Sequence, residues 1–515
     1  MHTRIVSATP LGVQAHLVDV EVDLSLGLLQ FHIVGLPDVA IKESRQRTAT
    51  ALKNCGIKLP ERKITVNLAP ADLKKEGALF DLPIALGILQ AAEFVHCSRE
   101  FLHETVVLGE LSLDGSIKPV RGVLPIAKGA YEAGKKRIIV PQANAAEAAL
   151  ISGLEVFGVS SLIDLIRHLR GEAFLLPTPP TVLDLKRPAG LLDFSDVIGQ
   201  KNAKRALQIA AAGRHNILFI GSPGSGKTML AQRLPTIMPP LTLAEALDVS
   251  AIYSISGKLS SSALVTERPF RAPHHTISQA GLVGGGSVPQ PGEISLAHRG
   301  ILFLDEFVEF KRAALEVLRQ PLECGEVNIA RAQHSATFPA AFLLVAALNP
   351  CPCGFYGDKK RACKCSGLQI KSYLDKLSGP LLDRIDIQVA VESVPREAVV
   401  DAHQNPHQLS SGQLYEGVCK AVAMQQKRFG DETTIWNATM LPSQIERCCS
   451  MSDQARELIQ QVFDKMGLSM RGYHKLLKIA RTIADLEEAN MIERHHVREA
   501  LMYRSLDKTL ERGTV

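Results

Sequence analysis

The sequence predicts an α/β protein with a parallel, phosphate-binding sheet at its centre, and three observations carry that prediction. An apolar run at 217–220 leads into a glycine-rich loop and then into a helix-like segment, 229–234. A second apolar run, 301–304, ends in two acidic residues. Residues 1–172 alternate short β-like and helix-like runs, and the residues from about 441 onward are helical in pattern. Short apolar runs bounded by turn signals are typical of buried parallel strands.

The chain divides into four predicted parts. Residues 1–172 form a compact α/β domain, and residues 173–190, which include four prolines, form an extended linker. Residues 191–395 carry the phosphate-binding motifs, and residues 396–515 form a helical lid domain. Helical periodicity is clearest in three stretches of the lid: 452–466, 471–488 and 493–506.

Composition excludes several classes of protein. The 515 residues are 46% hydrophobic and 22% charged, as in ordinary globular proteins of roughly three domains. No apolar run approaches the length of about 18 residues that a membrane-spanning helix needs, and the N-terminus lacks the apolar block of a signal peptide. Ten cysteines without an export signal indicate a reducing compartment. We therefore expect a cytoplasmic protein with no membrane partner.

Charge gives a weaker signal. The net charge of +5 is too small to indicate a nucleic-acid partner by itself. Between Lys42 and Lys75, however, nine Lys and Arg residues stand against three acidic ones. This local excess fits a surface that faces a polyanion, and it fits a solvated helix face equally well.

The loop after the first apolar run has the form Gly-x-x-x-x-Gly-Lys-Thr. Its glycines let backbone N–H groups close around phosphate oxygens, and the helix that follows adds its positive N-terminus. We expect Lys227 to contact the β- and γ-phosphates of ATP and Thr228 to bind Mg²⁺. A chance glycine loop is the alternative, and the acid pair downstream argues against it. The predicted nucleotide-binding residues are Gly221, Ser222, Pro223, Gly224, Ser225, Gly226, Lys227 and Thr228.

The acid pair is Asp305 and Glu306, directly after the apolar run 301–304. A carboxylate at the end of a strand next to a phosphate loop can bind Mg²⁺ through water, and this is the role expected of Asp305. Glu306 is the candidate base that orients the attacking water on the γ-phosphate. Either acid alone would more often be a solvated loop residue, so the pairing carries the prediction.

Six segments resemble those of the magnesium-chelatase-like AAA+ ATPases of the bacterial ComM/YifB type. The segments are GSPGSGKT (221–228), RPFRAPHHT (268–276), PGEISLAHRGILFLDE (291–306), NPCPCG (349–354), GPLLDRIDI (379–387) and SMRGYHKLLKIARTIADL (469–486). The phosphate loop is common to a whole superfamily, whereas RPFRAPHHT together with NPCPCG is much narrower. The resemblance covers the whole chain.

This resemblance implies a fold and a function. The fold is a Lon-protease-like (S5-like) α/β domain, an AAA+ parallel-sheet core and a C-terminal helical lid. The function is that of a homo-hexameric ATP hydrolase that moves DNA and uses ATP and Mg²⁺. Its partners would be single-stranded and branched DNA. It would promote branch migration during homologous recombination of DNA imported in natural transformation.

Three further catalytic positions are implied by the resemblance. Asn349 follows an apolar run and matches sensor 1, where the amide holds the lytic water. Arg384 matches the arginine finger, which reaches the γ-phosphate held by a neighbouring subunit. Arg471 matches the sensor-2 arginine, through which the lid responds to the nucleotide. Each has a plainer alternative: a turn-capping Asn, an arginine paired with a nearby Asp, and an ordinary helix-start arginine.

Two insertions are candidate DNA contacts. The first, 268–291, contains His274, His275 and three consecutive glycines that suit a flexible loop. The second, 325–338, indicates two strands around a turn and corresponds to the pore-lining hairpin of related motors. Arg331 and His334 in that turn are the predicted DNA-binding residues, contacting phosphates without sequence preference. A surface hairpin that packs between subunits is the alternative.

Four cysteines lie within fifteen residues: Cys351, Cys353, Cys363 and Cys365. Four thiols could close a tetrahedral Zn²⁺ site with a structural role, although Cys-x-Cys is not the usual Cys-x-x-Cys spacing. The alternative is four reduced surface cysteines.

The N-terminal domain resembles the protease domain of Lon, which needs a serine nucleophile and a lysine base. The comparable stretch, 75–83, contains no Ser, Thr or Cys, and Leu79 stands at the nucleophile position. We therefore expect a non-proteolytic domain. The main alternative to a DNA motor is a remodelling ATPase of the magnesium-chelatase type that acts on a protein or metal-insertion partner. An active protease is disfavoured because Leu79 stands where the nucleophile would be. A non-hydrolysing scaffold is disfavoured because Glu306 and Arg384 are both present.

Overall fold

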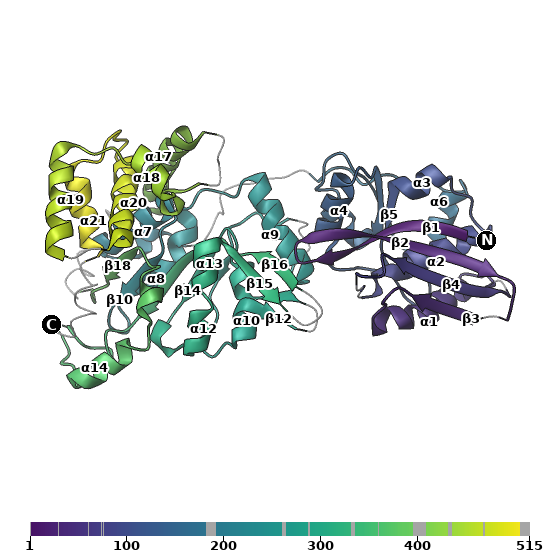
Figure 1. Ribbon diagram of the computed structural model, residues 1–515, viewed down its shortest axis with the longest axis horizontal. Coiled ribbons are helices and arrows are strands. Elements are labelled where there is room, and N and C mark those ends of the chain that lie inside the picture. Colours follow the sequence, from purple (N-terminus) through teal and green to yellow (C-terminus); the bar gives the residue numbers. More distant parts are fainter. Residues whose placement is uncertain are drawn as a thin grey trace.

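The computed structural model places an N-terminal α/β unit at one end of an elongated chain and a group of C-terminal helices at the other (Figure 1). The parallel sheet of the phosphate-binding core lies between them. The structure describes residues 2–28, 30–59, 61–73, 75, 77–181, 192–259, 264–286, 289–330, 335–358, 360–394, 408–430, 435–466 and 469–504.

The N-terminal unit is built on a seven-stranded mixed sheet of order β3-β4-β2-β1-β5-β8-β9. In the long antiparallel pair of β1 and β2, strand β2 alternates buried and partly exposed side chains, as expected where one face packs on the core. Helix α2 has ten of its eleven residues buried, and a Cβ at its Gly87 would lie 2.5 Å from Val22. The strands are β1 (His2–Leu11), β2 (Gln14–Ser25), β3 (Gln30–Val34), β4 (Lys63–Ala69), β5 (Thr105–Val107), β6 (Glu110–Leu111), β7 (Ile117–Lys118), β8 (Arg137–Pro141) and β9 (Glu155–Val159). The helices are α1 (Val39–Asn54), α2 (Asp81–Ala91), α3 (Arg99–Glu104), α4 (Val123–Glu132), α5 (Ala145–Ala148) and α6 (Leu162–Leu169).

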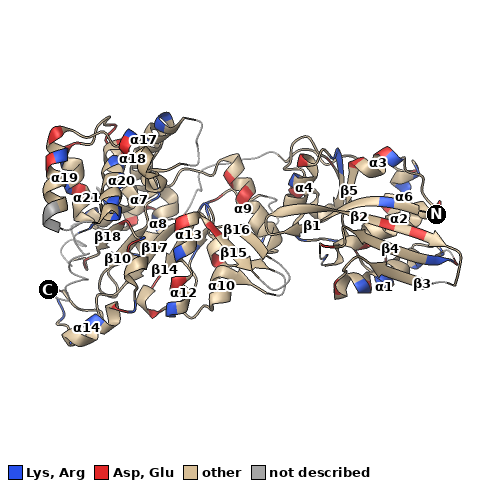
Figure 2. Ribbon diagram, in the orientation of Figure 1, with Lys and Arg blue, Asp and Glu red and all other residues tan. Residues whose placement is uncertain are grey.

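The basic stretch between residues 42 and 75 is not a continuous cationic surface. Lys75 is fully buried and donates to the carbonyl of Pro70. Arg47 pairs with the buried Asp81 at 2.7 Å. Strand β2 adds acidic residues beside β4, as the red segments in Figure 2 show. These contacts favour a structural role for part of the charge excess over a polyanion-facing surface.

We expect Arg47→Ala to destabilise the N-terminal unit by about 3 kcal/mol, because it leaves the buried carboxylate of Asp81 without its cationic partner. Asp81 is fully buried and accepts two hydrogen bonds from Arg47, with one more from the backbone N–H of Leu111. Urea unfolding of the full chain measures the loss. Arg45→Ala on the exposed side of the same helix is the control and should change stability by less than about 0.5 kcal/mol. Equal stability of the two variants would contradict the prediction.

The core sheet has five parallel strands in the order β11-β14-β17-β10-β18. Its three central strands are buried throughout, which confirms the predicted parallel sheet. The strands are β10 (Ile217–Ile220), β11 (Phe270–Arg271), β14 (Ile301–Leu304), β17 (Leu343–Leu348) and β18 (Ile387–Ala390). Two hairpins flank the sheet: β12 (Gly284–Gly285) with β13 (Gln290–Pro291), and β15 (Glu326–Ala330) with β16 (Ser335–Pro339).

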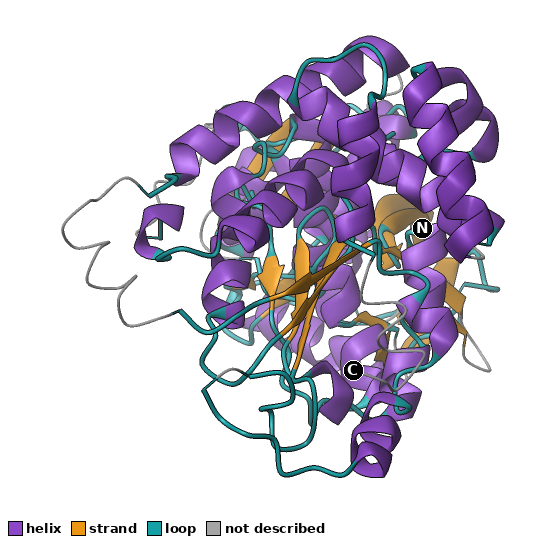
Figure 3. Cartoon of the chain, turned by 90° about the vertical axis from the view of Figure 1, so that its left-hand side faces the viewer, coloured by secondary structure: helices purple, strands orange, loops and turns teal. Residues whose placement is uncertain are grey.

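Helices enclose this sheet, as the end-on view shows (Figure 3). The core helices are α7 (Lys201–Gly213), α8 (Lys227–Arg233), α9 (Leu243–Ile255), α10 (Gln279–Val283), α11 (Glu293–Leu296), α12 (Arg312–Glu316), α13 (Arg319–Cys324), α14 (Gly367–Leu374) and α15 (Gly379–Leu382). The C-terminal helices are α17 (Ser411–Phe429), α18 (Pro442–Cys448), α19 (Asp453–Met466), α20 (Met470–Leu486) and α21 (Arg494–Met502). Helix α17 begins well before the onset at about 441 that periodicity predicted.

The C-terminal helices share one hydrophobic core with the sheet rather than forming a separate flap. Val418 of α17 and Ile479 of α20 pack in the same buried cluster as Ala206 of α7 and Phe219 of β10. The amide of Gln425 also donates to the carbonyl of Ala212 at 2.9 Å. A change in the angle of these helices would therefore repack one face of the sheet.

The N-terminal unit contacts the core at two places. Helix α4 packs on α9, where the Ser254 hydroxyl donates to the buried Glu147. At the second place the turn between β1 and β2 lies on the second hairpin, so close that a Cβ at Gly12 would come 2.9 Å from the carbonyl oxygen of Thr337. A small apolar cluster fills the first contact: Leu124, Leu150, Leu241, Ala246, Ala251 and Leu264. The boundaries between the four predicted parts of the chain stay a prediction.

Within the described ranges, every helix is too short or too polar to cross a bilayer.

Candidate active site

The glycine-rich loop connects β10 to α8 and has the geometry that its sequence requires. Gly224 and Gly226 have φ of 77° and 96°, which side-chain-bearing residues rarely adopt. The hydroxyl of Ser225 is buried and has no hydrogen-bond partner among the described residues. A buried unpaired donor in a loop of this kind suits a phosphate oxygen.

Lys227 is the first residue of α8, and its ammonium group closes the loop on itself. It donates to the carbonyl oxygens of Gly221 at 2.7 Å and Ser222 at 3.0 Å, and to Oδ1 of Asn349 at 3.2 Å. Burial lowers the pKa of Lys227, although Asp305 and Glu306 act in the opposite direction. A phosphate in the loop would replace these carbonyl contacts and favour the charged ammonium.

Thr228 and Asp305 meet across the ends of α8 and β14. The Thr228 hydroxyl donates to Oδ2 of Asp305 at 2.7 Å, and the backbone N–H of Glu306 donates to Oδ1 at 2.9 Å. Hydroxyl and carboxylate oxygens are the ligands that Mg²⁺ prefers. The predicted metal pair therefore lies together, directly beside the phosphate loop.

Glu306 has a partner that sequence reasoning did not assign. Its Oε2 atom lies 3.2 Å from Nδ1 of His275, in the insertion after β11. Glu306 also has φ of 49°, a left-handed conformation that is uncommon for a residue with a side chain. The sequence predicts that His275 belongs to a DNA-contacting insertion, whereas in the structure His275 contacts the candidate base. Nothing in its spacing from Glu306 could have shown this.

Removing the His275 imidazole should raise ATP hydrolysis in the absence of any partner, because it frees the Glu306 carboxylate to hold water. The gain should be about two- to fivefold, since such a partly exposed pair contributes up to about 1 kcal/mol. Steady-state phosphate release by His275→Ala measures it. His274→Ala is the matched control, because His274 bonds to Thr276 rather than to Glu306. Identical rates for the two variants would contradict the prediction.

The three glycines of the first insertion predict a flexible loop, but the structure places two of them in strand β12. Gly284 and Gly285 pair with β13, and a Cβ at Gly284 would lie 2.7 Å from Ile329 of β15. At least one of these glycines therefore allows two hairpins to approach closely. Arg331 and His334, the predicted DNA-binding residues, lie outside the described residues.

Arg384 and Arg471 meet at one carboxylate. The guanidinium group of Arg384 donates to Oε1 of Glu323 in α13 and to the carbonyl of Pro380. Arg471, in the first turn of α20, donates to the same oxygen at 3.3 Å. The expected finger and the expected lid arginine therefore form one cluster, and Arg384 is only 9% exposed.

The cluster lines a cavity of about 730 Å³. Six cationic side chains and two carboxylates line it: Arg214, Arg299, Arg384, Arg471, Lys475 and Lys478, with Glu323 and Asp386. Burial raises the pKa of Asp386, but Lys475 and His215 more than compensate and hold it well below its usual range. Lys475 also donates to the carbonyls of Asp383 and Ile385, so α20 anchors the turn that presents Arg384. The excess of cations suits a polyphosphate.

This cavity lies at the amino ends of the parallel strands, whereas the phosphate loop lies at their carboxyl ends. Asn216, which lines the cavity, directly precedes β10, whereas Gly221 directly follows it. Phe342 precedes β17 in the same way, and Asn349 follows it. The strands are parallel, and four residues of β10 span about 13 Å. None of the described residues that line the cavity belongs to the phosphate loop.

Comparison with known proteins agrees with this geometry. A family model described as "Magnesium chelatase, subunit ChlI" matches residues 193–399. Two further models, "Subunit ChlI of Mg-chelatase" and "Magnesium chelatase, subunit ChlI C-terminal", match 20–144 and 408–504. Over 516 residues the chain is 43% identical to "Competence protein ComM" of Haemophilus influenzae, covering 99% of this chain and 98% of the relative. The chain belongs to the magnesium-chelatase-like AAA+ ATPases of the ComM/YifB type.

Other relatives support the same assignment. "Uncharacterized protein YifB" of Salmonella typhimurium is 42% identical over 511 residues, with 99% of this chain and 97% of the relative covered. A 143-residue stretch, 27% of the chain, is 30% identical to "Lon protease 2" of Bacillus subtilis and covers 24% of it. The family implies ATP and Mg²⁺, which the unpaired Ser225 hydroxyl and the contact between Thr228 and Asp305 fit.

The Lon resemblance does not extend to a nucleophile. Leu79 lies in a short 3₁₀ turn, Ala78–Phe80, and is 7% exposed within the apolar core of the N-terminal unit. A buried hydrocarbon has no group that can attack a peptide carbonyl. That the domain is non-proteolytic stays a prediction.

Proposed function

We propose that this chain is a hexameric, ATP-driven DNA motor that promotes branch migration during homologous recombination of imported DNA. The observation that supports a ring is that Arg384 and the phosphate loop lie at opposite ends of the parallel strands, so that Arg384 is separated from the loop of its own protomer. The proposed role in transformation is supported by the full-length similarity to a relative named as a competence protein.

The proposed ATP site is shared between two protomers. One protomer supplies Lys227 for the phosphates, Thr228 and Asp305 for Mg²⁺, and Glu306 as the base. The next protomer would bring the cationic cavity against the γ-phosphate, where Arg384 and Arg471 would exchange Glu323 for the nucleotide. Mg²⁺, when bound, supplies charge neutralisation of the phosphates. Asn349 would orient the attacking water from its place beside Lys227.

Arg471 and Lys475 give this site a link to movement. Both belong to α20, which packs in the same core as the strands of the sheet. A nucleotide that takes Arg471 away from Glu323 would therefore pull on α20 and on one face of the sheet. This is how the shared site would convert phosphate contacts into domain movement.

The experiment is branch migration on a three-stranded or four-way DNA substrate, with and without ATP. We expect product only with ATP, and ATP hydrolysis that rises when branched DNA is added. Arg331→Ala should weaken DNA binding without lowering ATP affinity, and Arg99→Ala on the exposed helix α3 is the matched control. Hydrolysis that no DNA stimulates, with no branch migration, would contradict the proposal.

The family matches also fit a second candidate function, that of a remodelling ATPase. The three family models are those of the ChlI subunit of magnesium chelatase. A remodelling ATPase of that type would respond to a protein partner and not to DNA. Stimulation by such a partner alone is the result that would favour it.

A further inference from the structure

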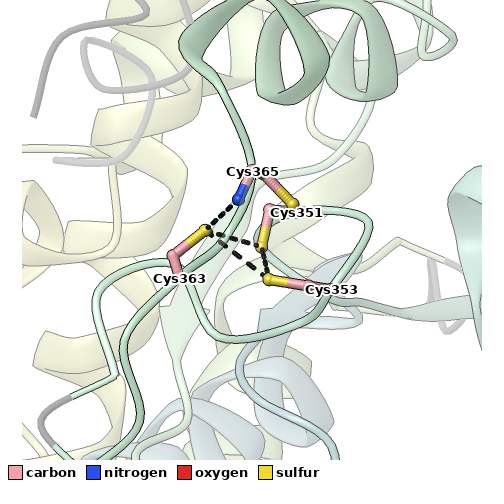
Figure 4. A group of neighbouring side chains, drawn as sticks. All are labelled: Cys351, Cys353, Cys363 and Cys365. Carbon is pink, nitrogen blue, oxygen red and sulfur yellow. Dashed lines mark hydrogen bonds between the residues drawn. The ribbon is translucent and has the colours of Figure 1, made fainter.

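Four cysteine sulfurs gather immediately after Asn349. Cys351 and Cys353 lie in the turn that follows β17, and Cys363 and Cys365 directly precede α14 (Figure 4). The Sγ atom of Cys351 lies 3.3 Å from that of Cys353 and 3.6 Å from that of Cys363, and the last two lie 3.5 Å apart. All four Sγ atoms are within 4.8 Å of one another.

These distances match a single tetrahedral ion better than the alternatives. Zinc–sulfur bonds of about 2.3 Å place neighbouring sulfurs about 3.8 Å apart in a tetrahedron. A disulfide would need about 2.05 Å. An iron–sulfur cluster, whose ligands bind different irons, would need the sulfurs further apart. Four thiolates are the ligand set of a closed structural Zn²⁺ site rather than an open catalytic one.

Backbone N–H groups support the sulfurs from outside. The N–H of Tyr356 donates to Cys351 at 3.3 Å, and the N–H of Cys365 donates to Cys363 at 3.4 Å. Hydrogen bonds of this kind orient metal ligands and stabilise thiolates. Cys351 is also completely buried, so its sulfur faces the other cysteines and not water.

The loop between the two cysteine pairs is held by turns and side-chain contacts, such as that of the Lys360 ammonium group with the carbonyl of Val394 at 3.1 Å, rather than by regular secondary structure. In its described part, between residues 352 and 364, it contains neither helix nor strand. Asp358 caps a turn through the N–H groups of Lys360 and Arg361, and Arg361 lies over the ring of Phe355 at 5.1 Å. Ordering such a loop costs about 1–2 kcal/mol for each residue, which local turns do not offset.

The same loop contacts the phosphate-binding loop. A Cβ at Gly354 would lie 2.6 Å from Pro223, so the two backbones are closely packed. Asp358 also hydrogen-bonds with the side chain of Ser222. The cysteine turn therefore touches the loop that holds phosphate and follows within two residues of Asn349.

We propose that Cys351, Cys353, Cys363 and Cys365 bind one structural Zn²⁺ ion, which holds this turn against the phosphate-binding loop. The ion cross-links the two ends of the turn and so fixes Gly354 and Asp358 against Pro223 and Ser222. The site does not depend on which polymer or partner the ATPase acts on.

Elemental analysis of the full chain, expressed in zinc-supplemented medium and purified without chelator, tests the proposal directly. We expect about one zinc per chain. Cys363→Ser with Cys365→Ser should lose nearly all of it and bind a fluorescent ATP analogue at least severalfold more weakly. Cys419→Ser removes a partly exposed free cysteine of α17, outside the cluster, and should leave both values unchanged.

A second measurement uses the unaltered protein and does not depend on how the variants fold. After chelation, the four thiols should react with a thiol reagent, and added Zn²⁺ should protect them. Iron in place of zinc, disulfides among the four cysteines, or thiol reactivity that added Zn²⁺ leaves unchanged would each overturn the proposal. Full zinc content in the double variant would overturn the assignment to these residues.

Discussion

Glu306→Gln is expected to abolish turnover while leaving ATP bound. Removing a positioned base typically slows a reaction by about 10²–10⁴-fold. The amide has nearly the shape of the carboxylate, so the contacts of Lys227 and Thr228 with phosphate and Mg²⁺ remain. The carboxylate of Glu306 is 54% exposed and lies beside His275, so it is free to take a water molecule once that pair opens. Phosphate release and equilibrium binding of a fluorescent ATP analogue separate the two effects.

The matched control is Glu309→Gln, three residues further along. Glu309 is a partly exposed acid whose carboxylate lies 3.8 Å from the ammonium group of Lys376. The Glu309→Gln variant should hydrolyse ATP at close to the normal rate. A normal rate in Glu306→Gln would mean that another group activates the water.

Arg384→Ala should lower the hydrolysis rate by about 10³–10⁵-fold, the usual contribution of an arginine finger. Nucleotide affinity should change little, because the cavity that Arg384 lines contains none of the described phosphate-loop residues. Arg319→Ala is the matched control. Arg319 is a partly exposed arginine on the same helix as Glu323, and it pairs with Glu316 of the preceding helix. Comparable losses in the two variants would contradict a specific role for Arg384.

Mixing two inactive variants tests whether the site is shared. Lys227→Ala lacks the phosphate contact but keeps Arg384, and Arg384→Ala has the opposite defect. In a randomly mixed ring about one interface in four combines both intact halves, so about a quarter of the activity should return. No recovery in mixed rings of verified composition would place both residues at the same protomer's nucleotide.

Much of the fold was predictable because its signals are local. The buried runs of β10, β14 and β17 are continuous in sequence, and parallel strands buried on both faces require such runs. The three predicted lid helices also occur close to their expected limits, as α19, α20 and α21. Helix α17 lies before residue 441, where the predicted helical pattern begins. It was missed because its buried face is set by packing on α7 and α20 rather than by a clear periodicity of its own.

The candidate site divides in the same way. Lys227 and Thr228 could be assigned because they close the glycine-rich loop after one apolar strand, and Asp305 because it directly follows another. The carboxyl ends of parallel strands lie on the same side of a sheet, so these residues were expected to meet. The contact between His275 and Glu306 could not be predicted, since it joins an insertion to a strand end across 31 positions. The same holds for Arg471, which lies 87 positions from Arg384 and meets it only through Glu323.

The chemistry could be assigned from short stretches of the chain: a phosphate loop, an acid pair, four clustered cysteines and the strands that carry them. Glycine conformation, strand burial and side-chain type are properties of a few neighbouring residues, so they can be recognised without the fold. The folded chain was needed to show that Arg384 and Arg471 line one cavity, at the end of the strands opposite Gly221. It was also needed to show that the four sulfurs converge after Asn349. Those distances depend on how helices and strands far apart in the chain pack, because an interior that is closely packed admits few arrangements.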